Sequence, residues 1–151
     1  MYKQFKKDFN RIDKKITGWM KEAGVPLLRY SLATIFIWFG ILKPLGLSPA
    51  QKLVAHTVYW FSPSWFVPFL GWWEVVIGLC LLYRPLIRIG ILLLFIQMVG
   101  TFLPLVVLPG IVFGAKPYAL TLEGQYIIKN LILISAAIVI GSHVRDRKKQ
   151  R

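Results

Sequence analysis

The sequence contains only one cysteine, Cys80, and two histidines, His56 and His143. One thiol cannot form an intramolecular disulfide, and it is too few for a cysteine-ligated zinc or iron–sulfur centre. The two histidines fall at opposite ends of the expected topology, which disfavours a haem ligated by both. The sequence therefore assigns no metal site and no catalytic residues to the chain.

Acidic residues are also scarce: six Asp and Glu stand against 19 Lys and Arg, which gives a formal net charge of +13. In a soluble protein this excess favours nucleic acid as a partner. Here the basic residues gather at the chain ends and in one short loop, as the positive-inside rule describes for membrane proteins. We therefore expect a lipid bilayer with anionic lipids at its cytoplasmic face as the partner, and no nucleic acid.

Apolar residues, in contrast, are abundant at 56%, and the mean hydropathy of +0.60 is too high for an ordinary soluble domain. Four apolar runs approach the roughly 20 residues that cross a bilayer as a helix. The predicted spans are 26–45, 66–83, 86–108 and 123–142. The sequence thus predicts an all-α integral membrane bundle of four helices over residues 25–144, followed by a basic cytoplasmic tail at 145–151.

Residues 1–24 combine regularly spaced apolar residues with many basic ones. The apolar face holds Phe5, Phe9, Ile12, Ile16, Trp19 and Met20, and the basic side chains are Lys6, Lys7, Arg11, Lys14 and Lys15. This pattern predicts an amphipathic helix on an anionic membrane surface, ending at Gly24 before Pro26. A disordered basic tail is the alternative.

The distribution of basic residues predicts the orientation. With the N terminus placed in the cytoplasm, 15 of the 19 Lys and Arg residues lie on the cytoplasmic side and four on the other side. These four are Lys43, Lys52, Lys116 and Lys129. We therefore expect a multi-pass protein with both termini in the cytoplasm.

Polar residues occur within all four predicted spans. Above the inner boundary, Lys43 lies at about 21 Å, Glu74 at about 15 Å and Gln97 at about 13–14 Å, if each helical residue rises roughly 1.5 Å. By the same arithmetic Thr101 lies at about 20 Å and Lys129 at about 24 Å. These five residues are the candidate ligand-binding residues, because ionisable groups within a membrane are costly and commonly functional.

Lys43 and Glu74 differ in height by about 6 Å, which a lysine side chain can span. Gly71 and Gly78 share a helical face with Glu74, and small residues allow close helix packing in membranes. We therefore predict an ion pair between Lys43 and Glu74 inside the bundle. Two alternatives stay open: the lysines reach the outer interface and do nothing else, or the pair is purely structural.

Three segments resemble a known family: RYSLATIFIWFGILK, GWWEVVIGLCLL and EGQYIIKNLILISAAIVI. Together with the proline-containing third span, they are similar to the DoxX-like superfamily of small four-span membrane proteins, and most of all to its YkgB group. The resemblance covers residues 28–144. The residues that fit the family pattern are Arg29, Gly40, Lys43, Gly71, Glu74, Gly78 and Lys129. Asn130 departs from it, since related sequences often carry an aspartate there.

The resemblance implies a four-helix membrane bundle. Our first hypothesis for function is a bacterial inner-membrane accessory of redox or oxidative-stress physiology, whose polar residues hold a quinone or similar small lipophile. Such a chain would need a soluble or membrane redox partner, and it could be the membrane subunit of a quinone-linked oxidoreductase. The alternative is a membrane assembly, chaperone or small-solute transport module without a redox role. Self-association into a homo-oligomer is left open.

Overall fold

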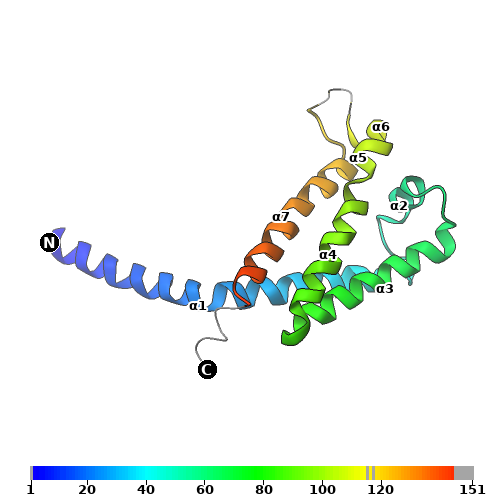
Figure 1. Ribbon diagram of the computed structural model, residues 1–151. Coiled ribbons are helices and arrows are strands. Elements are labelled where there is room, and N and C mark those ends of the chain that lie inside the picture. Colours follow the sequence, from blue (N-terminus) through cyan, green and yellow to red (C-terminus); the bar gives the residue numbers. More distant parts are fainter. Residues whose placement is uncertain (1, 115, 117, 145–151) are drawn as a thin grey trace.

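The computed structural model describes residues 2–114, 116 and 118–144, and this part of the chain is helical (Figure 1). The elements in order are α1 (Tyr2–Leu42), α2 (Gln51–Thr57), α3 (Pro63–Leu82), the 3-10 helix η1 (Arg84–Leu86), α4 (Ile87–Phe102), α5 (Pro104–Val107), α6 (Pro109–Val112) and α7 (Leu122–Ser142). Among these residues the one β-type pairing is an isolated bridge between Phe113 and Leu120. The predicted all-α class is thereby confirmed for the described chain.

Four segments are long and apolar enough to cross a membrane, as predicted. The second and fourth spans match α3 and α7 within a few residues. The third span is divided, because α4 ends at Phe102 and α5 begins at Pro104, whose ring nitrogen has no proton to donate. The predicted tail, residues 145–151, lies outside the described residues.

The first helix corrects one prediction. The chain does not leave helical geometry at Gly24, because α1 continues without interruption through Gly24 and Pro26 to Leu42. Pro26 removes only one hydrogen bond, to the carbonyl of Glu22, and that part of the helix is exposed. Water can satisfy the free carbonyl there, so the proline is tolerated within the helix.

Helices α1 and α3 pack closely because glycines remove side chains from their interface. A Cβ atom added at Gly71 would lie 2.5 Å from the carbonyl oxygen of Gly40, and one at Gly78 would lie 2.8 Å from that of Ala33. The two helices therefore run antiparallel with their backbones almost in contact. This contact sets the relative heights, along the helix axes, of the side chains at the interface between α1 and α3.

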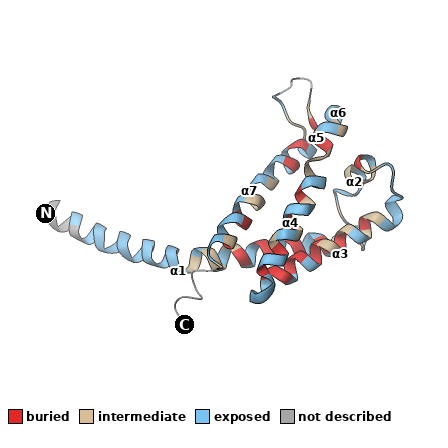
Figure 2. Ribbon diagram, in the orientation of Figure 1, coloured by how far each residue is buried: buried red, intermediate tan, exposed pale blue. Residues whose placement is uncertain are grey.

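The apolar core occupies one end of the molecule. Its buried members come from four helices: Leu32, Ala33 and Phe36 from α1, Ile77 and Leu81 from α3, Ile87, Leu94 and Met98 from α4, and Ala136, Ala137 and Ile140 from α7. Figures 1 and 2 show that α4 and α7 cross the α1–α3 pair at this end and rise away from it toward α5 and α6. The four helices thus share one core at the predicted inner end and separate into two pairs farther out.

Pro44 and Pro104 have no amide proton to donate to the carbonyls of Gly40 and Gly100, but both carbonyls accept another hydrogen bond. The amide of Lys43 donates to the Gly40 carbonyl at 3.2 Å, and the amide of Leu103 donates to the Gly100 carbonyl at 3.2 Å. Both are bonds between residues three apart, which tighten the last turn of a helix when the next residue is a proline. The prolines therefore end α1 and α4 without leaving these two carbonyls free.

Candidate functional site

Lys43 is the first residue after α1, and the break in the helix determines where its side chain lies. Pro44 prevents the helix from continuing, and Gly46 follows with a φ of 71°, a left-handed conformation that glycine adopts readily. The amide of Leu47 donates to the carbonyl of Leu42 at 2.9 Å and closes the turn. The side chain of Lys43 is thereby held against α3 and is only 7% exposed.

Glu74 of α3 is the centre of the polar group in this part of the molecule. The residue is 8% exposed, and its carboxylate binds two partners, since Oε2 accepts a hydrogen bond from Lys43 Nζ and Oε1 accepts one from Gln97 Nε2. The predicted ion pair is confirmed, and Gln97 of α4 joins it. We call Lys43, Glu74 and Gln97 the polar triad. It joins α1, α3 and α4 just beyond the apolar core.

The amide of Gln97 has one group without a protein partner. Its Nε2 faces the carboxylate, while its Oε1 is buried and accepts no hydrogen bond from any described residue. The amide cannot simply turn over, because its oxygen would then face the oxygen of Glu74. A buried acceptor without a donor typically costs about 1–3 kcal/mol. The triad therefore presents an acceptor that a water molecule or a ligand hydroxyl can satisfy.

Two of the predicted ligand-binding residues lie apart from the triad. Thr101 is on the same helix as Gln97, but its hydroxyl donates to the Gln97 backbone carbonyl at 3.1 Å. Lys129 of α7 is exposed, and its Nζ lies 5.4 Å from the centre of the Tyr126 ring. The structure thus brings together three of the five residues. That these residues bind a ligand stays a prediction.

Arg29 is a further buried charge, which the sequence analysis did not include among the candidate ligand-binding residues. Its side chain is 8% exposed, its guanidinium carbon lies 4.7 Å from the centre of the Tyr30 ring, and its Nε has no partner within the described part of the chain. Only its place in the family pattern signalled a role. It belongs to the core end of the bundle rather than to the triad.

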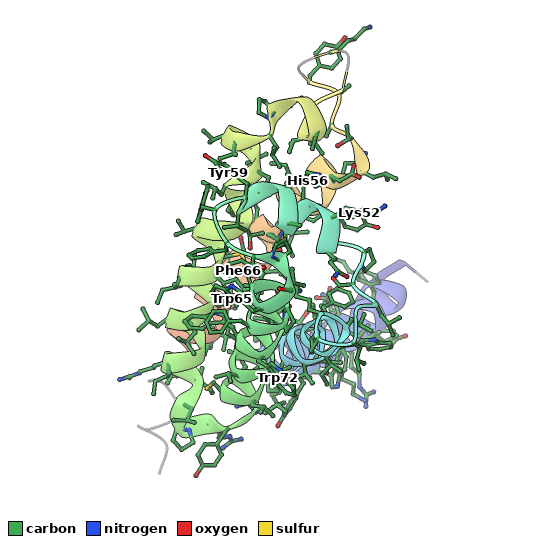
Figure 3. All side chains as sticks on the ribbon, turned by 90° about the vertical axis from the view of Figure 1, so that its right-hand side faces the viewer. Lys52, His56, Tyr59, Trp65, Phe66 and Trp72 are labelled. Carbon is green, nitrogen blue, oxygen red and sulfur yellow. The ribbon has the colours of Figure 1, made fainter. Side chains whose placement is uncertain are left out.

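A continuous series of aromatic contacts runs along the outer end of α3. Successive rings lie within 6.5 Å of one another from the loop after α2 into α3, and the members are Tyr59, Trp60, Phe61, Trp65, Phe66, Phe69 and Trp73. Figure 3 faces this end of the molecule, with Tyr59 and His56 near α2 and Trp65 and Phe66 at the start of α3. The series ends at Trp73, the residue before Glu74. The aromatic contacts thus extend along α3 to the residue that precedes the triad glutamate.

The basic residues assigned to a membrane surface lie on α1 before the bundle begins. Lys6, Arg11, Lys14 and Lys15 are exposed, and the side chain of Lys7 lies outside the described side chains. None of the four exposed lysines and arginines forms an ion pair with a described residue. Their contact with a membrane stays a prediction.

Two shallow surface grooves lie away from the triad. One is formed along α1 from Tyr30 to Phe39, and the other along α3 and η1 from Val76 to Leu86. Neither includes a triad residue.

Comparison with protein-family models, with curated proteins and with solved structures gives no match for this chain, so the resemblance to the DoxX-like superfamily stays a hypothesis.

Proposed function

We propose that the polar triad binds the polar head of a small lipophile, with a quinol and its quinone as the best match. The observation that carries this proposal is the buried, unpartnered Oε1 of Gln97. A quinol hydroxyl supplies the donor that this oxygen lacks. Lys43 has further N–H groups beyond the one given to Glu74, and these can donate to a quinone carbonyl.

Energetics favour a role beyond packing. Removing two charged groups from water costs several kcal/mol per ion. Well-packed apolar residues in the same place often stabilise a protein at least as well as a buried ion pair does. Ionisable residues within membrane helices are rare and commonly functional for this reason. The hydrogen bond between Gln97 and Glu74 joins α4 to α3, two helices that diverge toward their outer ends (Figure 1).

In this proposal the chain is an accessory protein of the bacterial inner membrane, with both termini in the cytoplasm and a role in redox or oxidative-stress physiology. A bound quinone would supply two-electron redox chemistry. Lys43 and Gln97 would hold its oxygens, and Glu74 would position both side chains. The enzyme that exchanges electrons with it would be a soluble or membrane partner, consistent with the DoxX-like resemblance.

A matched pair of ligands tests the role of Gln97. In the full-length protein in lipid nanodiscs, we expect a short-chain quinol to bind about tenfold more tightly than its dimethyl ether, which has no hydroxyl donors. The Gln97→Leu variant should lose this preference. The Gln125→Leu variant should keep it, because Gln125 is exposed at the outer start of α7. Binding can be followed by isothermal titration calorimetry.

Two results would contradict the proposal. Equal affinity of the wild type for the quinol and for the ether would mean that a water molecule satisfies Gln97. Absence of binding by either compound, in a protein that keeps its helical circular dichroism, would favour the structural alternative for the triad.

A further inference from the structure

Arg29 is a buried cation that has no counter-ion in the described part of the chain. The residue is 8% exposed, its Nε is buried without an acceptor, and the one ion pair among the described residues joins Lys43 to Glu74. A guanidinium stays protonated in proteins, and a buried charge is strongly unfavourable unless it is paired and hydrogen-bonded. Contact with the Tyr30 ring, 4.7 Å from the guanidinium carbon, leaves the positive charge uncompensated. Arg29 therefore needs an anionic group.

The described acidic side chains do not supply that group. Glu74 binds Lys43 and Gln97 instead. The other described acids are exposed and form no ion pair with a described residue; they are Asp8, Asp13, Glu22 and Glu123. The sixth acid of the sequence, Asp146, lies outside the described residues.

Arg29 lies at the end of the bundle where α3 passes into η1. A Cβ atom added at Gly78 would lie 2.8 Å from the carbonyl oxygen of Ala33, so these two residues are level in the antiparallel pair of helices. Arg29 comes four residues before Ala33 and is therefore level with Leu82, the last residue of α3. The exposed Arg84 follows in η1 and adds positive charge at this end.

The guanidinium of Arg29 and the lipid-facing side of α3 lie on one side of the helix pair. At 100° per residue, Tyr30 is rotated by about 60° from Ala33, and Leu79 by about 100° from Gly78, in the same sense. Because the two helices are antiparallel, rotations of the same sense lead to the same side of the pair. The Tyr30 ring, which holds the guanidinium, is therefore on the side of Leu79 and away from the apolar core.

An apolar groove begins on this side at the level of Arg29. It is lined by Val76, Leu79, Cys80, Leu82, Tyr83 and Leu86. From Leu82 it extends along α3 to Val76, which is about 9 Å farther into the span. Leu79 is exposed on a helix that is long and apolar enough to cross a membrane. A buried cation thus lies at one end of an apolar groove that faces the hydrocarbon.

We propose that Arg29 binds the phosphate of an anionic phospholipid and that one acyl chain of this lipid lies in the groove along α3. A guanidinium forms paired, charge-assisted hydrogen bonds with phosphate, and these would satisfy Nε. The charge of Arg84 favours an anionic lipid over a zwitterionic one, as at other basic sites between membrane helices. This inference is independent of the ligand of the triad.

Native mass spectrometry of the full-length protein in a neutral detergent tests the proposal. Three lipids with identical acyl chains are titrated: phosphatidylglycerol, phosphatidylcholine and diacylglycerol. We expect phosphatidylglycerol to bind about tenfold more tightly than phosphatidylcholine, and diacylglycerol, which has no phosphate, to bind most weakly. Arg29→Gln should abolish the preference. Lys52→Gln should keep it, because this variant removes one positive charge from an exposed position on α2.

Equal binding of phosphatidylglycerol and diacylglycerol by the wild type overturns the proposal, and this comparison does not depend on the folding of any variant. Displacement of phosphatidylglycerol by millimolar inorganic phosphate would assign the site to a free anion instead. Much tighter lipid binding by Asp146→Asn would show that a carboxylate of the chain itself occupies Arg29. Either of these results also contradicts the assignment to a lipid.

Discussion

Replacing Lys43 by Met or Glu74 by Gln should each lower the free energy of unfolding by about 3–5 kcal/mol, and the double replacement should cost less than either. Each single change leaves a buried charge without its counter-ion, since the two side chains pair at 7% and 11% exposure. The double variant has no unpaired charge, and the new amide at position 74 can still bond with Gln97. Unfolding in detergent by increasing SDS, followed by circular dichroism, measures all three values.

Lys129→Met is the matched control for this cycle. It also removes a lysine from a membrane helix, but Lys129 is exposed, so we expect a change within about 0.5 kcal/mol. Strictly additive losses in the double variant would mean that Lys43 and Glu74 do not interact in the folded protein.

Gly71→Ala should destabilise the protein by about 1–3 kcal/mol or more and weaken the triad as well. The new methyl group would lie 2.5 Å from the Gly40 carbonyl oxygen and 2.8 Å from Cβ of Lys43, so α1 and α3 must move apart. Gly100→Ala is the control, because a Cβ atom there meets nothing within 4 Å. In that helix alanine should be neutral or stabilise by about 1 kcal/mol.

The two glycine variants can be compared by the same SDS unfolding measurement. Equal stability of the two would show that α1 and α3 do not approach as closely as the glycines at their interface indicate.

The pairing of Lys43 with Glu74 was predictable from sequence because it depends on heights along two helices that are consecutive among the membrane spans. Helical rise sets those heights, and the glycines around Glu74 indicated which face was buried. Gln97 shares the polar level for the same reason. The free oxygen of its amide was not predictable, since it depends on the orientation of one side chain against the carboxylate.

The exposure of Lys129 could not be predicted from helical rise and repeat alone. It lies seven residues before Ala136 and eleven before Ile140, so the helical repeat places all three on one face of α7. Ala136 and Ile140 are buried in the common core, but Lys129 is exposed. The difference arises because the N-terminal half of α7, which contains Lys129, diverges from the α1–α3 pair (Figure 1). The angle between helices depends on packing across the whole core, so it cannot be predicted from the helical repeat of one segment.

The continuity of α1 was missed for a local reason. Gly24 and Pro26 are each typical of a helix end, and together they predicted one. Both residues are nevertheless compatible with a helix whose carbonyls can reach water, and α1 continues through the predicted boundary at residue 24. As a consequence, the N-terminal part of α1 extends away from the bundle (Figure 1).

Native mass spectrometry of the protein, released from the membranes in which it was made, tests most directly whether the triad is a ligand site. We predict that the wild type carries a bound lipophile with the mass of a quinone or quinol. The Lys43→Met, Glu74→Gln double variant should fold, as its helical circular dichroism would show, and should lose that mass. A wild type without a bound lipophile, or a double variant that retains it in the same amount, would contradict the account and leave the triad as a structural link between helices.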